Sequence, residues 1–124
     1  MHTRVPASLR EVLAELTTSE GILGSALIGF DGIMIAEHFV VDVNLEKISA
    51  LLSSVFNNVQ QVFSDLKQGA VAQCWFETER YSFFVHVTSV GLLLTIARHE
   101  APVGLVRLSI RKARAQLEKT EAQL

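Results

Sequence analysis

The sequence predicts an α+β protein, a three-layer α/β/α arrangement in which a five-stranded antiparallel sheet lies between helices. Apolar residues recur with the 3.6-residue period of a helix in three segments, and five other segments are rich in aromatic and β-branched residues. Both alternating sets of side chains in these five segments are largely apolar, which predicts a sheet covered on both faces. The expected order is helix, strand, strand, helix, strand, strand, strand, helix.

The first helix is expected over residues 9–18. Ser8, followed three residues later by Glu11, forms a capping box, in which the two side chains satisfy free backbone N–H groups at the start of a helix. Gly21 is expected to end this helical segment, because glycine is a poor helix former and a frequent terminator.

Two strands are expected next, over residues 22–30 and 33–39, with Asp31 and Gly32 between them. An Asp-Gly pair between apolar runs is a strong hairpin signal, because a type I′ turn needs positive φ at both central residues. We therefore expect positive φ at both residues of this turn.

The longest helix is expected to begin after Asn44, a good N-cap residue, and to end at Gly69, the expected C′ residue. Its apolar residues follow the helical period over about six turns. These are Leu45, Ile48, Leu52, Val55, Phe56, Val59, Val62, Phe63 and Leu66.

The rest of the chain predicts three strands and a closing helix. The strands, over residues 71–77, 80–87 and 92–98, are expected to form an antiparallel meander. Pro102 suits the N1 position of the helix that follows, because its missing N–H has no intrahelical acceptor there. The sequence has no internal repeat, linker or low-complexity segment, so residues 1–124 are expected to form a single domain.

Composition excludes several classes of protein. The chain has 124 residues, of which 49% are hydrophobic and 19% charged, and its net charge of −2 argues against a dedicated nucleic-acid binder. One cysteine, Cys74, cannot form an internal disulfide, which favours a reducing, cytoplasmic compartment. The longest apolar stretch, residues 90–97, is far shorter than the roughly 20 residues of a membrane span, so no membrane insertion is expected.

Charge is unevenly distributed along the chain. Residues 98–124 contain six Lys or Arg and three Glu, whereas the preceding residues are acidic overall. Arg107, Arg111 and Arg114 form a basic stripe on the closing helix, expected on the sheet face opposite the long helix. The stripe is typical of a solvated helix end, and a charged docking surface is the alternative.

The sequence shows no catalytic, metal or cofactor signature. The four histidines, His2, His38, His86 and His99, lack the spacing of metal ligands, and His86 is expected to be a half-exposed strand residue. Cys74 has no basic neighbour in sequence to activate it. No glycine pattern predicts a phosphate-binding loop, so we expect a protein that is not an enzyme and binds no cofactor.

The long helix is unusual because it has no charged residue between Lys47 and Asp65. A solvated helix face favours Glu, Lys and Arg, whereas uncharged amides and hydroxyls can be desolvated against another protein without burying a charge. Its polar side therefore predicts a protein interface. The residues expected to form it are Ser53, Ser54, Asn57, Asn58, Gln60 and Gln61, flanked by Ser49 and Ser64.

The apolar side of the same helix spans about 140°, more than one small sheet requires. The strand over residues 71–77 would lie at a sheet edge if the meander runs inward from it, and an apolar edge strand is a template for pairing. Pairing with a second copy would cover both surfaces, which predicts a homodimer. The expected dimer interface comprises Leu51, Val55, Val59, Val62, Val71, Cys74, Trp75 and Phe76.

Together these features resemble the roadblock family, which includes the roadblock light chain of dynein and bacterial relatives such as the gliding-polarity regulator MglB. The likeness extends from about residue 9 to residue 117. The matching segments are Gly21-Ile22, Ala26-Leu27-Ile28, Asp31-Gly32-Ile33-Met34-Ile35-Ala36, the uncharged long helix, and Gly104-Leu105-Val106-Arg107 through Lys112-Ala113.

The resemblance implies a homodimer joined through the strand after the long helix, with the two long helices side by side. It implies a non-catalytic platform that binds a Ras-like small GTPase through the long helices, here the face from Ser53 to Gln61, and some members act as GTPase-activating partners. Two alternatives remain open: a structural adaptor of the dynein light-chain type that binds extended peptides, and a ligand-sensing α/β domain.

Overall fold

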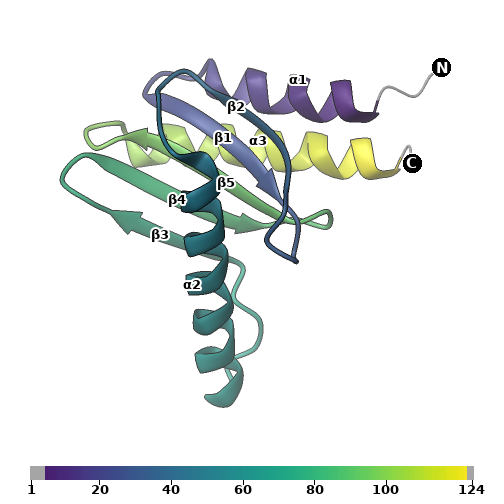
Figure 1. Ribbon diagram of the computed structural model, residues 1–124, viewed down its shortest axis with the longest axis vertical. Coiled ribbons are helices and arrows are strands. Elements are labelled where there is room, and N and C mark those ends of the chain that lie inside the picture. The colour runs from purple at the N-terminus through teal and green to yellow at the C-terminus, as the bar shows by residue number, and fades with distance from the viewer. Residues whose placement is uncertain (1–4, 123–124) are drawn as a thin grey trace.

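A computed structural model describes residues 5–122 and contains three helices and five strands in the predicted order (Figure 1). The elements are α1 (Val5–Thr17), β1 (Ile22–Ile28), β2 (Met34–Phe39), α2 (Leu45–Asp65), β3 (Gln73–Glu77), β4 (Tyr81–Val87), β5 (Leu92–Arg98) and α3 (Val103–Ala122). The predicted fold class is therefore confirmed.

The five strands form one antiparallel sheet in the order β2-β1-β5-β4-β3. The most apolar strands, β1 and β5, pair at the centre, where Ala26 lies opposite Leu94. Strand β3 pairs only with β4 in the described part of the chain, with Trp75 opposite Phe84. The strand after the long helix is thus an edge strand, and the meander runs inward from it.

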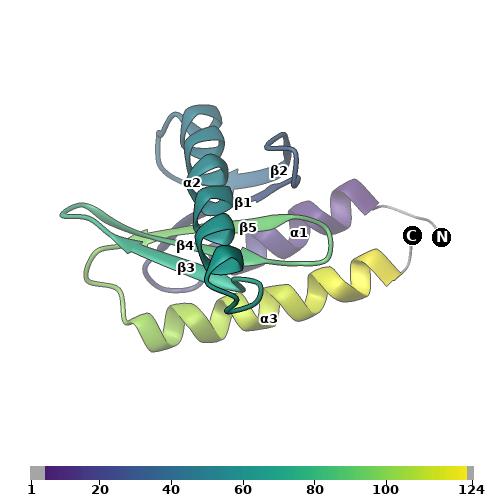
Figure 2. The ribbon, with the colours of Figure 1, turned by 90° about the horizontal axis from the view of Figure 1, so that it is seen from below.

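Helices cover both faces of the sheet. Helices α1 and α3 lie side by side on one face, and α2 crosses the other (Figures 1 and 2). Leu13, Phe84 and Ile110 belong to the core between the sheet and the helix pair, whereas Phe56 and Val85 belong to the core under α2. Beyond Phe56 no residue of α2 is buried, and in Figure 1 the end of the helix extends past β3.

The start of α1 differs from the prediction. The helix begins at Val5, so Ser8 lies within it and the predicted capping box does not form its start. Pro6 lies in the first turn, where its missing N–H costs no intrahelical hydrogen bond and its fixed φ suits a helix. The capping-box pattern is misleading here because helical backbone extends upstream of it.

The hairpin between β1 and β2 forms, but not through the predicted type I′ turn. Gly29 donates its N–H to the Ile33 carbonyl (2.8 Å), and Gly32 donates to the Gly29 carbonyl (2.9 Å). Gly32 has φ +87°, but Asp31 is not among the described residues with positive φ. The loop thus has three residues, with a glycine in the left-handed region at its end. The Asp31 carboxylate stabilises it by accepting a hydrogen bond from Ile33 N (3.0 Å).

The other two helix starts are close to prediction. Asn44 caps α2, because its side-chain oxygen accepts a hydrogen bond from Lys47 N (3.2 Å). Helix α3 begins at Val103, and the Pro102 carbonyl accepts the first helical hydrogen bond, from Val106 N (3.1 Å). Pro102 is therefore the N-cap and not the predicted N1 residue.

The end of α2 is closed by Lys67 and not by Gly69. Lys67 has φ +58°, and its N–H donates to the Ser64 carbonyl (3.0 Å) while Gln68 N donates to the Phe63 carbonyl (2.9 Å). This pair of bonds is a Schellman motif, in which the C′ residue is left-handed. Gly69 lies two residues too late to be the C′ residue, so that prediction is wrong.

A glycine at the C′ position should stabilise the protein. Lys67→Gly removes the steric strain of a Cβ in the left-handed region, but glycine also gives the unfolded chain more conformational entropy. After both effects we expect the free energy of unfolding to rise by about 0.5–1 kcal/mol. Urea unfolding at fixed protein concentration measures it. Gln68→Gly is the matched control and should be neutral or destabilising, because Gln68 does not have positive φ. Equal effects of the two substitutions would show that the Lys67 backbone is not strained.

Candidate interaction surfaces

Helix α2 presents three different faces. Leu45, Ser49, Ser53 and Phe56 are buried against the sheet. A second face carries exposed apolar residues, and a third carries exposed uncharged polar ones. The first face fixes the helix on the sheet, which leaves the other two free on the described chain.

The exposed apolar face is a continuous line along the helix, called here the apolar stripe. Spacings of four, seven and four residues place its members on one side of an α-helix over about 22 Å. Between 40% and 59% of each side chain is exposed, which is high for large apolar residues. The stripe consists of Leu51, Val55, Val62 and Leu66. Two predicted dimer residues are half-buried and do not belong to it: Val59, which lies beside it on α2, and Val71, which packs against the core under the helix.

The exposed polar face, called here the polar stripe, consists of Ser54, Asn57, Gln61 and Ser64. Their spacings of three, four and three residues place them on one side of α2. An open groove of about 530 Å³ runs between this side of the helix and the connection to β3, with Asn57, Gln61 and Ser64 among its lining residues. Three predicted partner-binding residues, Ser54, Asn57 and Gln61, thus share one exposed surface.

The other three predicted partner-binding residues lie elsewhere. Ser53 is 5% exposed and faces the β1–β2 turn near Gly32, so it cannot contribute to a docking face. Small side chains such as Ser49 and Ser53 are buried here because α2 crosses close to the sheet. Asn58 is exposed and lies at the border of the two stripes, because its helical neighbours three and four residues away belong to both of them.

Gln60 has a structural role, because its side chain holds the connection between α2 and β3. Its side-chain oxygen accepts a hydrogen bond from Val71 N (2.8 Å), and its side-chain nitrogen donates to the Val71 carbonyl (3.0 Å). The two bonds tie the connection after α2 back onto the helix and position the start of β3. Because both ends of the amide are engaged and the side chain is half-buried, Gln60 belongs to the scaffold of the site.

The two faces of the edge strand β3 have different neighbours. Cys74 and Phe76 pack against the core under α2, and burial raises the pKa of the Cys74 thiol, which disfavours a reactive thiolate. Trp75 points to the other face, where it stacks on Phe84 with ring centroids 5.8 Å apart. The Arg107 guanidinium lies over the indole, 5.5 Å from the ring centroid.

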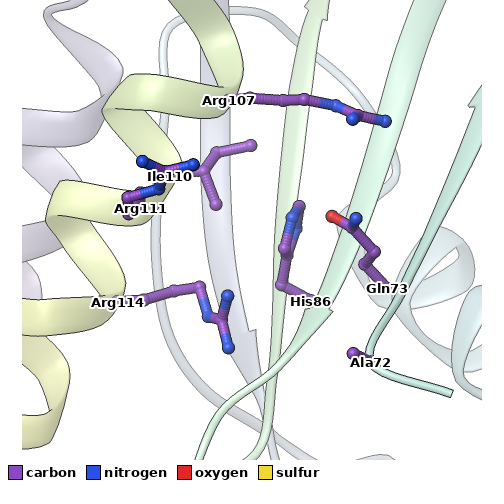
Figure 3. A pocket seen from close by; sticks show the side chains of 7 residues that line it. All are labelled: Ala72, Gln73, His86, Arg107, Ile110, Arg111 and Arg114. Carbon is purple, nitrogen blue, oxygen red and sulfur yellow. The ribbon is translucent and has the colours of Figure 1, made fainter.

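A small pocket of about 210 Å³ lies between α3 and the strands β3 and β4 (Figure 3). His86 of β4 is at its centre, with Arg107 and Arg114 reaching toward that strand from α3 on either side of it (Figure 3). The remaining lining residues are Ala72, Gln73, Ile110 and Arg111. The basic stripe of the sequence therefore lines a pocket on the sheet face opposite α2.

The sequence predicts a half-exposed His86, but the side chain is only 5% exposed. Burial, followed by the positive charges of Arg114 and Arg107, lowers the pKa of His86 to about 4, so the imidazole is neutral at pH 7. Sequence reasoning missed this arrangement because the approach of α3 to β4 is a tertiary contact. The available signal was the spacing of the three arginines, which places them on one side of α3.

In the part of the chain that the structure describes, no three His, Cys, Asp or Glu side chains gather as metal ligands. Within the same residues, the helices are too short or too polar to cross a membrane.

Comparison with known proteins gives consistent matches. The family model for the Roadblock/LC7 domain matches residues 9–98. The protein MJ1340 of Methanocaldococcus jannaschii, itself uncharacterized, is 27% identical over 107 residues, which cover 86% of this chain and 94% of MJ1340. The gliding protein MglB of Thermus thermophilus has a similar structure, with a TM-score of 0.87 and 19% identity, over 100% of this chain and 96% of that chain. MglB of Myxococcus xanthus gives a TM-score of 0.89 and 16% identity, with the same coverage.

The region matched by the family model runs from the first helix to the end of the last strand. The two MglB structures share the arrangement of three helices around a five-stranded sheet. The resemblance deduced from the sequence is thereby confirmed, and the chain belongs to the Roadblock/LC7 domain family.

Proposed function

We propose that the protein is a non-catalytic homodimeric platform that binds and regulates a Ras-like small GTPase in the cytoplasm. The observation that carries the proposal is the presence of two separate exposed faces on α2, one apolar and one polar without charge. The apolar stripe is suited to a permanent contact with a second copy. The polar stripe is suited to a partner that binds and leaves, because its side chains are also well solvated when free.

The dimer is proposed to form through both β3 and α2. Strand β3 has no neighbour on its outer side in the described chain, so its backbone groups can pair with those of a second β3. A twofold axis beside β3 would bring two α2 helices together on the same sheet face. The part of α2 that extends past β3 carries Val62 and Leu66, which supports contact between the helices there.

A small GTPase is proposed as the partner because the chain belongs to the Roadblock/LC7 domain family and resembles MglB in structure. The polar stripe has no arginine, so any acceleration of GTP hydrolysis would come from ordering the catalytic residues of the GTPase itself. The raised pKa of the Cys74 thiol and the low pKa of His86 support a non-catalytic role, because neither group is activated as a nucleophile or base near pH 7.

The polar stripe is tested by Asn57→Arg in a binding titration against a panel of Ras-like GTPases loaded with a non-hydrolysable GTP analogue. We expect at least about a tenfold loss of affinity, because the larger cation must be desolvated at the contact. Arg111→Ala changes a residue on the opposite sheet face and should leave affinity unchanged. Loss of binding with Arg111→Ala alone would move the docking site to the basic stripe.

Asn58→Arg provides a third variant for the same titration. Because Asn58 borders both the apolar and the polar stripe, this substitution is expected to weaken the dimer as well as the complex. Asn57→Arg should leave the dimer intact. Light scattering on both variants therefore separates loss of GTPase docking from loss of the platform.

A further inference from the structure

The pocket between α3 and the β3–β4 edge contains an unusual collection of groups. Three arginines and a histidine line it, and none of its lining residues in the described chain is a carboxylate. All of them come from one chain, on the sheet face opposite α2, so the pocket shares no residue with the polar stripe, and it adjoins β3, the strand that is proposed to pair in the dimer. We propose that this pocket is a binding site for a small oxyanion, specifically a phosphate group.

His86 supports a built site because it is buried without a hydrogen-bond partner. It is 5% exposed, and its Nδ1 atom is buried and accepts or donates no hydrogen bond within the described structure. Buried polar groups in folded proteins are normally satisfied, because an unsatisfied one costs about 1–3 kcal/mol. Its side chain lines the pocket together with Gln73, so a ligand there can supply the missing partner.

The arginines are likewise only partly satisfied. Arg114 donates one hydrogen bond, from Nη2 to the Val87 carbonyl (3.2 Å), and its Nε atom is buried without a partner in the described structure. Arg107 lies over the Trp75 ring, a contact that leaves its N–H groups free to donate. A planar guanidinium offers two parallel N–H donors, the geometry that best matches carboxylate and phosphate oxygens.

Charge and size restrict the ligand. Three guanidinium groups around a neutral imidazole produce a positive potential, and Gln73 from β3 adds only a neutral amide. A volume of about 210 Å³ accommodates a phosphate group with a few waters, but it is smaller than the roughly 300 Å³ at which pockets for drug-sized ligands begin. The site thus suits a free phosphate ion or the phosphate of a modified side chain, and it is too small to enclose a nucleotide.

An anion would also change the histidine. With a phosphate between the arginines, the positive field at His86 is partly neutralised and the imidazolium gains an acceptor, so the pKa of His86 should rise from about 4. This response is local to the pocket, and it distinguishes occupation of the site from a general effect of salt.

The experiment is a titration of the whole chain with inorganic phosphate, in parallel with chloride at equal ionic strength, followed by NMR at the His86 ring and by thermal unfolding. We expect saturable shifts at His86 and stabilisation with phosphate only. O-phosphoserine is the second arm: tighter binding than inorganic phosphate identifies a modified side chain as the natural source, and equal or weaker binding identifies the free ion.

Arg111→Gln should weaken phosphate binding at least about fivefold, because it removes an exposed donor without disturbing the core. Lys112→Gln is the matched control, since it removes the same charge from a neighbouring residue that does not line the pocket, and it should change affinity less than about twofold. Equal effects of phosphate and chloride, or equal losses in the two variants, would overturn the proposal. Neither result would bear on GTPase docking, which uses the opposite sheet face.

Discussion

Val62→Glu is expected to convert the protein from a dimer into a folded monomer. Val62 is 53% exposed on the apolar stripe, beyond the part of α2 that packs on the sheet, so a glutamate there is solvated in the single chain. In the dimer the same carboxylate would be buried against an apolar partner without a counter-ion, at a cost of several kcal/mol, or at least about a hundredfold in the dissociation constant. Light scattering across a range of protein concentrations measures the change.

Ser64→Glu is the matched control for this substitution. It introduces the same charge two residues further along α2, but on the polar stripe, and should leave the dimer intact. Lysine at Cys74 or Phe76 on β3 would also oppose the dimer, yet both side chains pack into the core under α2, so loss of folding would confuse the result. A wild-type protein of about 14 kDa at micromolar concentration would contradict the dimer outright.

The stability of the protein is expected to fall between pH 7 and pH 5 because of His86. Its pKa is about 4 when folded, against 6.5 for an unperturbed histidine, so over this range the unfolded chain binds the proton and the folded chain does not. The stabilising contribution of the neutral imidazole is complete above pH 6.5 and is lost as the pH falls toward 4. From this one group we expect a loss of about 2 kcal/mol in the free energy of unfolding between pH 7 and pH 5.

His86→Gln isolates this contribution, because it removes the titrating group and leaves the carboxylates that also titrate. We measure the free energy of unfolding with urea in phosphate-free buffer at pH 7 and pH 5. Its decrease between these two pH values should be smaller in the variant than in the wild type by about 2 kcal/mol. Arg107→Gln should also reduce the decrease, since one source of the lowered pKa is removed, whereas Lys112→Gln should have less effect. The same pH dependence in wild type and His86→Gln would exclude His86 as its origin.

The order of the elements was predictable because it depends on local patterns. The helical period of α2, the cap at Asn44 and the apolar runs of β1 and β5 each act within a few residues of the chain. Errors arose where two local signals competed. The Asp31-Gly32 pair suits a two-residue turn, but it belongs to a three-residue loop. Lys67 occupies the left-handed position expected for Gly69, because the Schellman hydrogen bonds outweigh the preference of a residue with a Cβ for negative φ.

The candidate surfaces were predictable only in outline. A helix without charge and with too wide an apolar side is visible in the sequence, and both extra faces of α2 exist. Which residues belong to each face depends on how the helix is rotated on the sheet. That rotation buries Ser53 and places Asn58 at the border of the two stripes, and the hydrogen bonds of Gln60 to Val71 appear only when the chain returns to form β3.

The sequence by itself therefore determined the fold class, the family resemblance and the presence of an uncharged helix and a basic stripe, because these follow from periodicity, composition and the order of motifs along the chain. Tertiary structure alone decided that β3 is at an edge, that α2 extends beyond it, and that the stripe of α3 meets a buried His86. These features join residues far apart in sequence. Their geometry depends on how the helices pack on the two faces of the sheet, which no local sequence pattern specifies.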